Sequence, residues 1–105
     1  MTTNEMSPEA ERLRVLYVSP EVSPFTKPGH LADAAQALPK SLSSLGVEIS
    51  LIMPKYRRPE IESLDLKLVL SELLVPLGND KAKANVYRAE SGRTPIYFID
   101  NPKYF

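Results

Sequence analysis

The chain has 105 residues and carries 13 acidic and 13 basic side chains, so its formal net charge is zero. This balance gives no electrostatic support for nucleic acid or an anionic membrane as a partner, and we expect neither. The chain has no cysteine and one histidine, which excludes disulfides, thiolate metal sites and a histidine-rich metal cage; we expect no metal and no cofactor.

The N-terminal segment "MTTNEMSPEAER" is polar and lacks the apolar core of a signal peptide. We predict that residues 1–12 form a flexible tail and that residues 13–105 fold. No apolar run approaches membrane-spanning length, so the expected location is the cytoplasm.

The next segment, "LRVLYVS" from Leu13 to Ser19, is apolar without polar alternation, which predicts a central parallel strand covered on both faces. A helix should follow, and Gly46 occupies the position of its C-terminal cap. Pro39 interrupts the helical pattern and predicts two abutting helical pieces. The helix should bury one apolar stripe, made of Leu31, Ala34, Ala35, Leu38, Leu42 and Leu45.

Residues Val47 to Met53 predict a second strand, closed by Pro54. Strand, helix and strand then form a βαβ unit, whose two strands are parallel almost without exception. The segment "KYRRPEIES" that follows is expected to be a polar loop. Its basic cluster, made of Lys55, Arg57 and Arg58, is interpreted as solvated surface rather than a binding site.

The second half of the chain predicts further strands. Leu66–Leu77 and Lys83–Ala89 flank turn residues and suit an antiparallel hairpin or meander. "SGRT" predicts another turn, and Pro95–Asp100 a further strand with an apolar centre. A sheet with so few parallel strands leaves apolar faces and edges uncovered, so we expect these residues to be the opening part of a longer domain.

The loop between the first strand and the helix, "SPFTKPGH", is the main candidate site. Free backbone N–H groups and the positive end of a helix suit a phosphate at this position. Lys27 can add a positive charge, and Gly29 allows close approach of a ligand or a positive φ. Neither a dinucleotide fingerprint nor a P-loop pattern is present, and the alternative reading is a plain Pro-Gly turn.

Three polar residues flank this loop. His30 can donate to a phosphate or a sugar hydroxyl, or can cap the helix or lie partly exposed at its start. Glu21 and Asp33 can hold sugar hydroxyls, or can cap the helix and solvate the loop. No carboxylate pair and no serine with a base partner has spacing that indicates catalysis, so we predict no catalytic residue in the chain.

Several motifs resemble, in the same order, the N-terminal end of bacterial glycogen synthases and plant starch synthases: "SPEVSPF", "KPGHLAD", "ALPKSL", "MPKY" and "TPIYFIDNPKYF". The resemblance runs from about Arg14 to Phe105. It implies a glycosyltransferase of the GT-B type, with a Rossmann-like domain on each side of a cleft. The expected fold is therefore an α/β Rossmann-like parallel sheet with a hairpin insertion. Residues 13–105 would form an incomplete N-terminal half-domain of the catalytic domain, truncated at its C-terminal end.

The same resemblance implies a function. Members of the family transfer glucose from ADP-glucose to the non-reducing end of an α-1,4-glucan and retain the anomeric configuration. By resemblance, Lys27 lies at the donor phosphates, Gly29 and Asp33 match the loop glycine and the following aspartate, and Glu21 faces the cleft. The expected partners are an ADP-glucose or UDP-glucose donor and an α-1,4-glucan acceptor. Retaining transfer needs positive charge on the departing diphosphate and a closed cleft, so we expect this chain alone to be inactive.

Two positions depart from the family pattern: Pro28 replaces a threonine and His30 a second glycine. Proline removes an N–H donor, and histidine adds a side chain where backbone should approach the ligand. One reading is therefore a piece of an ADP-glucose-dependent synthase. The alternative is a degenerate, non-catalytic module that binds glucan or nucleotide sugar. An unrelated nucleotide-binding domain would rest on fold alone.

Overall fold

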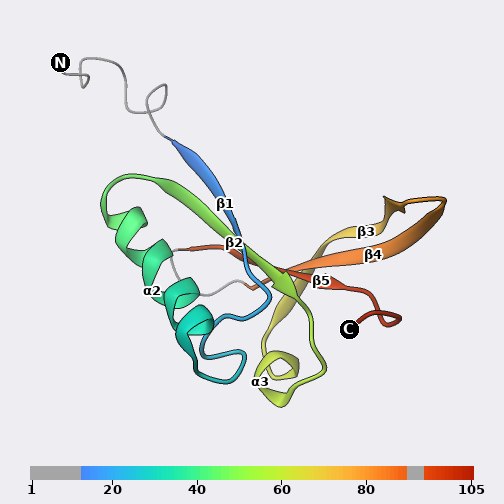
Figure 1. The fold of residues 1–105 in the computed structure, drawn as a ribbon, viewed down its shortest axis with the longest axis horizontal. Coiled ribbons are helices and arrows are strands. Elements are labelled where there is room, and N and C mark those ends of the chain that lie inside the picture. Colours follow the sequence, from blue (N-terminus) through green and yellow to red (C-terminus); the bar gives the residue numbers. More distant parts are fainter. Residues whose placement is uncertain (1–12, 90–93) are drawn as a thin grey trace.

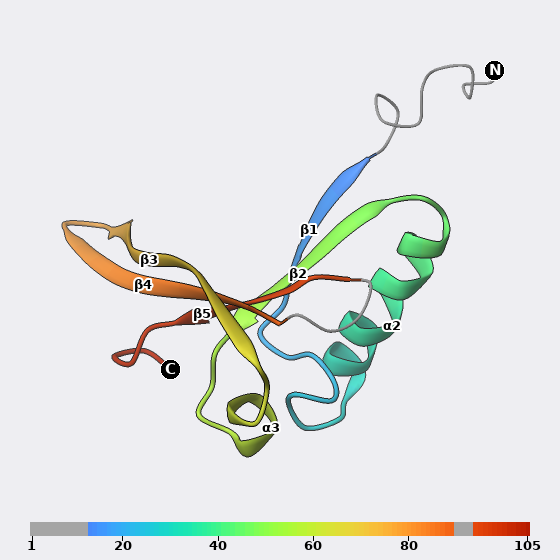
Figure 2. The same cartoon turned by 180° about the vertical axis from the view of Figure 1, so that it is seen from behind.

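The computed structural model describes residues 13–89 and 94–105. Within these residues, five strands form one sheet in the order β1-β2-β5-β4-β3, accompanied by two helices (Figures 1 and 2). The elements, in chain order, are β1 (Arg14–Val18), α2 (His30–Ser44), β2 (Glu48–Pro54), α3 (Pro59–Glu62), β3 (Leu66–Leu77), β4 (Asp80–Ala89) and β5 (Ile96–Asp100). The predicted tail, residues 1–12, and most of the predicted "SGRT" turn lie outside the described residues.

The sheet combines a parallel and an antiparallel part. Strands β1, β2 and β5 are parallel, with Val15 opposite Ile49 and Met53 opposite Phe98. Strand β4 runs antiparallel to both β5 and β3. This arrangement confirms the βαβ unit and the expected Rossmann-like sheet with a hairpin insertion. The hairpin β3–β4 is inserted between β2 and β5 in the sequence and occupies one side of the sheet.

Helix α2 is continuous, so the prediction of two abutting helical pieces is wrong. Pro39 lies inside the helix, where it lacks the N–H that would bond the carbonyl group of Ala35. It is also buried, on the side of α2 that faces the sheet. Tertiary packing of this face offsets the lost hydrogen bond and keeps the helix intact.

The predicted apolar stripe of α2 is also largely wrong. The buried residues of the helix are Ala32, Ala35 and Pro39, whereas Leu31 and Leu38 are 48% and 45% exposed. Small side chains let the helix axis approach the sheet closely, and this decides which face turns inward. Leu31, Leu38 and Leu45 are exposed in the described part of the chain, Leu42 is half-buried, and Ala35 is buried as predicted.

The C-terminus of α2 confirms the predicted glycine cap. Gly46 has φ +89°, in the left-handed region that favours glycine. Its N–H donates to Ser43 O at 3.1 Å, and Val47 N–H donates to Leu42 O at 3.1 Å. These two bonds define a Schellman motif, which ends the helix and turns the chain into β2.

The segment predicted as a polar loop contains a short helix, α3. Its start fits the preference for proline in the first helical turn, with Pro59 following Arg58 in extended conformation. Ile61 on this helix is fully buried. The loop prediction was wrong because one apolar side chain among polar neighbours was enough to dock the segment on the core.

The core lies on the face of the sheet that α2 and α3 cover. Phe98 of β5 is fully buried at its centre, and its ring meets the Phe25 ring edge-to-face with centroids 5.6 Å apart. The cluster consists of Val22, Ala35, Leu51, Met53, Ile61, Ala89 and Phe98. The core thus packs the loop after β1 against strands β2 and β5.

Apolar side chains elsewhere on the sheet are exposed. Strand β1 lies at one edge of the described sheet, so the prediction of a central strand covered on both faces is wrong. Its Leu16 and Val18 alternate with inward residues and are 59% and 70% exposed. The hairpin β3–β4 extends away from the helices (Figure 1), and Leu70 and Leu74 are each 53% exposed. The hairpin also bends at register shifts near Glu72, which has φ +54° and donates its N–H to Asn85 Oδ1 at 2.9 Å.

Candidate functional site

The carboxyl ends of the three parallel strands bring their loops to one edge of the sheet. The loop after β1 spans residues 19–29, the segment after β2 begins at Lys55, and the turn after β5 begins at Asn101. In open α/β sheets, ligands bind at the carboxyl ends of the strands. This edge is therefore the candidate site, and it contains every sequence-predicted site residue.

The loop after β1 is anchored at its first half. Val22 O accepts hydrogen bonds from the N–H groups of Phe25 and Thr26, at 2.9 Å and 3.1 Å, which closes a tight turn. Ser23 N–H donates to Ala32 O at 3.0 Å, and Ser23 Oγ donates to Asp33 Oδ1 at 2.8 Å. Since Ser23 is nearly buried, these bonds fix the loop to the first turn of α2.

The second half of the loop, Lys27 to His30, is exposed and leads into α2. The helix begins at His30, and Gly29 makes no side-chain hydrogen bond as its N-cap. The first backbone N–H groups of α2 therefore carry no cap from this residue, and they add to the positive potential of the helix end. Lys27 brings a further positive charge to the same place. The chemistry of this half favours an anion.

Gly29 takes only one of its two predicted roles. Its φ of 171° is extended backbone, which any residue adopts, so the alternative of a positive φ is excluded. A Cβ at this position would meet no atom within 4 Å. The fold therefore does not require glycine here, and a need for glycine would have to come from a ligand.

The predicted carboxylates separate in the structure. Asp33 lies in the first turn of α2, as expected, but its Oδ1 accepts from Ser23. It therefore holds the loop rather than capping the helix. Glu21 is exposed on the other side of the loop, and its charge acts on Tyr56. Lys27, Gly29 and His30 thus lie together at the helix start, while Glu21 belongs with the residues after β2.

Sequence reasoning did not assign a role to Tyr56, Asn101 or Phe105. The Tyr56 and Phe105 rings meet edge-to-face with centroids 6.1 Å apart. Burial, followed by the negative charge of Glu21, raises the pKa of the Tyr56 phenol above its ordinary 10.0. The available signal was their position: "MPKY" and "NPKYF" each follow a predicted parallel strand directly, where ligand-binding residues gather.

The basic cluster after β2 is partnered within the chain. Arg57 lies 3.9 Å from Asp100, and Arg58 lies 3.5 Å from Glu60. Lys55 Nζ lies 5.7 Å from the centre of the Tyr87 ring. Surface pairs of this kind contribute little to stability. They give Arg57 and Arg58 carboxylate partners within the chain.

A cavity of about 400 Å³ lies between α2 and the sheet. It is mainly apolar, and none of the five predicted site residues lines it. Its walls are Val22, Ser23, Pro24, Phe25, Gln36, Pro39, Lys40, Ser43, Ser44, Leu51, Thr94 and Ile96. The cavity is thus separate from the exposed anion-favouring end of α2.

Within residues 13–89 and 94–105, no helix is long and apolar enough to cross a membrane. The same described ranges contain no group of three or more His, Cys, Asp or Glu side chains that could hold a metal ion.

Fold and site together define a class. A parallel βαβ unit with an uncapped helix end and a lysine at the carboxyl edge of its sheet is typical of α/β domains that bind phosphorylated ligands. The model of the starch synthase catalytic domain matches residues 14–105, and the chain belongs to this family.

Curated relatives of the chain are glycogen synthases. The protein from Photobacterium profundum is 32% identical over 105 residues, which cover all of this chain and 21% of the relative. Those from Geobacillus thermodenitrificans and Geobacillus stearothermophilus are each 38% identical over 93 residues, covering 89% of this chain and 19% of the relative. The chain thus spans about a fifth of the length of the curated relatives it matches.

A solved structure shares the fold. It is the catalytic domain of starch synthase IV from Arabidopsis thaliana, bound to ADP and acarbose. It aligns with a TM-score of 0.75 at 23% sequence identity, over 88% of this chain and 19% of that one. The likeness supports the expected α/β architecture.

Proposed function

We propose that this chain supplies the N-terminal part of an α-1,4-glucan synthase. In this proposal the whole enzyme transfers glucose from ADP-glucose to the non-reducing end of glycogen or starch, with retention of configuration. The observation that carries the proposal is the exposed, uncapped start of α2 beside Lys27, in a chain of the starch synthase catalytic-domain family.

The role of the loop is to hold the donor diphosphate. Lys27 supplies a positive charge, and the first N–H groups of α2 supply hydrogen-bond donors. Pro28 has no N–H to give, and we propose that the exposed imidazole of His30 supplies a donor in its place. Asp33 accepts a hydrogen bond from Ser23 and so fixes the loop against the first turn of α2.

ADP-glucose is the donor we favour over UDP-glucose. The Arabidopsis protein of the same fold is bound to ADP. The base would lie beyond the diphosphate, away from the residues that the loop supplies, so the choice rests on this likeness.

By itself the chain is expected not to transfer glucose. The charge that develops on the departing diphosphate needs several preorganised positive groups in a site that excludes water. The chain spans about a fifth of its relatives' length, and Lys27 and the α2 N-terminus lie on an exposed edge.

The alternative function is a non-catalytic module that binds glucan or nucleotide sugar. Pro28 and His30 favour it, because they replace a donor and a small residue in the phosphate loop. Pro28→Thr and His30→Gly, made in a full-length synthase that carries this segment, separate the two functions. A large gain of glucose transfer would support the degenerate module. Unchanged transfer would remove its basis.

The test of the proposal is a chimera. Residues 14–105 of this chain replace the matching segment of the Geobacillus stearothermophilus glycogen synthase, which is 38% identical over 93 residues. We expect the chimera to extend glycogen from ADP-glucose with retention of configuration. Lys27→Ala should lower kcat/KM by about 100-fold or more, the usual cost of one charge-stabilising group. Lys40→Ala, an exposed lysine further along α2, is the matched control.

Equal rates for Lys27→Ala and Lys40→Ala would remove Lys27 from the site. An inactive chimera whose thermal unfolding matches that of the parent synthase would contradict the proposed enzyme function.

A further inference from the structure

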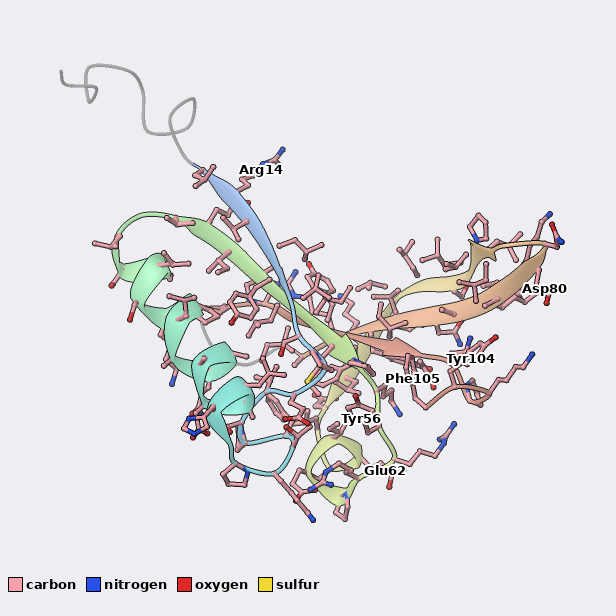
Figure 3. The ribbon with its side chains drawn as sticks, viewed as in Figure 1. Arg14, Tyr56, Glu62, Asp80, Tyr104 and Phe105 are labelled. Atoms are coloured by element: carbon pink, nitrogen blue, oxygen red, sulfur yellow. The ribbon has the colours of Figure 1, made fainter. Side chains whose placement is uncertain are left out.

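A second half of the candidate site lies beside the phosphate loop and differs from it in chemistry. Tyr56 follows the carboxyl end of β2, and Phe105 follows that of β5. Their rings form the edge-to-face pair with centroids 6.1 Å apart and planes at 79°. Figure 3 shows the two residues together at the end of β2, with Tyr104 farther out. Tyr56 is half-buried, and Phe105 is 36% exposed.

The backbone that carries the pair is fixed before any ligand arrives. Asn101 is nearly buried, and its Oδ1 accepts from the N–H groups of Lys103 and Tyr104 at 2.9 Å and 3.2 Å. Its Nδ2 donates to Lys83 O at 3.1 Å, and its backbone oxygen accepts from Phe105 N–H at 2.9 Å. Tyr104 N–H also lies 3.1 Å from Asn101 O, so five hydrogen bonds of Asn101 hold one short turn. Such preorganisation lowers the ordering cost of binding.

On the β2 side the chain is also held. Lys55 N–H donates to Ile99 O at 2.7 Å, and Tyr56 O accepts from Arg58 N–H at 3.0 Å. Both rings therefore project from fixed positions at the ligand-binding edge of the sheet.

Polar groups suited to hydroxyls border the rings. Within residues 13–89 and 94–105 the Tyr56 hydroxyl makes no hydrogen bond, so it is free to donate or accept. The Glu21 carboxylate is exposed, and its negative charge, after burial, raises the pKa of the Tyr56 phenol above its ordinary 10.0. A carboxylate here disfavours an anion and favours a ligand that donates hydrogen bonds.

Two basic side chains beside Tyr56 have partners within the chain. Arg57 faces Asp100 at 3.9 Å, and Lys55 lies over the Tyr87 ring. The edge thus has a cationic half at Lys27 and the start of α2, and an aromatic half at Tyr56 and Phe105 that the Glu21 carboxylate borders. An uncharged ring with hydroxyls on its rim and C–H groups on its face fits the second half, because aromatic faces attract C–H groups.

We propose that Tyr56 and Phe105 form a platform for a glucose unit of the glucan acceptor, with Glu21 accepting hydrogen bonds from its hydroxyl groups. The inference rests on the proposed function for the identity of the sugar. It adds an acceptor subsite next to the donor phosphate loop. Glu21 precedes Lys27 in the loop after β1, and its charge acts on Tyr56.

The test has a binding arm and a kinetic arm. In the binding arm, maltoheptaose is titrated into the 105-residue chain and the aromatic resonances are followed by NMR. We expect the Tyr56 and Phe105 resonances to shift on saturation. Phe105→Ala should weaken binding about five- to tenfold, the effect of losing one important contact residue. Tyr104→Ala removes an aromatic ring from the same turn, 56% exposed and outside the pair, and should change binding less than twofold, as surface contacts usually do.

In the kinetic arm, the chimera carries the same substitutions. Tyr56→Ala and Phe105→Ala should raise KM for glycogen about five- to tenfold and leave KM for ADP-glucose unchanged, because the platform contacts only the acceptor. Tyr56→Phe keeps the ring and should cause a smaller rise. Thermal unfolding of each variant identifies losses caused by folding, and Phe105→Ala is the least disruptive variant because its ring is partly exposed.

The outcomes separate the two proposals. An active chimera whose acceptor KM is unaffected by Tyr56→Ala and Phe105→Ala would overturn the platform and leave the proposed function standing. An inactive chimera would count against the proposed function, and the NMR titration would then decide the platform alone. Resonance shifts confined to other residues would overturn it.

Discussion

Asn101 offers the sharpest test of how the candidate site is held. Its side chain makes three hydrogen bonds that fix the turn after β5. Asn101→Ala removes all three at a nearly buried position. Asn101→Asp is the matched control, because it keeps an acceptor for Lys103 and Tyr104 and places an oxygen in the position of the amide group that donates to Lys83 O.

The size of the effect follows from these contacts. An intramolecular hydrogen bond contributes about 0.5–1.5 kcal/mol net. The Lys103 and Tyr104 residues are exposed, so water can replace part of the lost bonding. We therefore expect Asn101→Ala to lower the free energy of unfolding by about 2 kcal/mol and Asn101→Asp by about 1 kcal/mol. A domain of this size loses about 4–8 °C in Tm per kcal/mol.

The assay is urea unfolding of the 105-residue chain, followed by far-ultraviolet circular dichroism. With a slope of about 1–1.5 kcal/mol per molar urea, Asn101→Ala should lower the midpoint by roughly 1.5 M. An unchanged midpoint for Asn101→Ala, or equal losses of unfolding free energy in Asn101→Ala and Asn101→Asp, would refute the claim that the side-chain oxygen of Asn101 stabilises the turn.

Three further predictions concern the core, the α2 cap and the Tyr56 phenol. Phe98→Ala should lower the free energy of unfolding by about 3–5 kcal/mol, because Phe98 is fully buried at the centre of the cluster. Measured by thermal melting, Phe98→Leu should lower it by less than half as much. Equal losses for the two variants would contradict this packing. Gly46→Ala should cost about 1–2 kcal/mol in urea unfolding, because φ is +89° although the space around it is open; a neutral result would mean that the backbone relaxes. The raised pKa of Tyr56 means that the folded state holds the phenolic proton more tightly than the unfolded one, so the free energy of unfolding should fall as pH rises from 10.0 through the raised pKa. Phenolate absorbance, taken as a difference against Tyr56→Phe, should show the pKa of Tyr56 moving down in Glu21→Gln, and no movement would exclude the charge of Glu21 as a cause.

Local chemistry made much of the fold predictable. Gly46 was recognisable as a cap because a Schellman motif depends on one residue and its immediate neighbours. The parallel strands were predictable as strands because they are apolar runs, but the continuous apolar run of β1 indicated a central place and the strand lies at the edge of the described sheet. The position of the loop at Lys27, between β1 and α2 at the carboxyl edge of the sheet, was predictable because it follows from the order of elements.

The errors arose where packing decides. Leucine spacing indicated the wrong face of α2, since the sheet accepts the smaller Ala32 and Ala35. Pro39 did not break the helix, because its buried position offsets the missing N–H. The bend at Glu72 depends on Asn85 in the partner strand, so no pattern within one strand reveals it.

The contact between Tyr56 and Phe105 was likewise beyond sequence patterns. The two residues are far apart in the chain and meet only because β5 pairs with β2 in parallel. The link between Ser23 and Asp33 has the same origin: both residues were visible, but the bond depends on how the loop returns to the helix.

The central claim is that the loop at Lys27 binds the donor diphosphate, and nucleotide affinity tests it most directly. Calorimetric titration of the chimera with ADP and with adenosine separates phosphate contacts from base contacts. The account predicts that Lys27→Ala weakens ADP binding about tenfold, as expected for the loss of a charged hydrogen bond, and leaves adenosine binding unchanged. Equal affinities of Lys27→Ala and the unmodified chimera for ADP, or equal losses for ADP and adenosine, would contradict it.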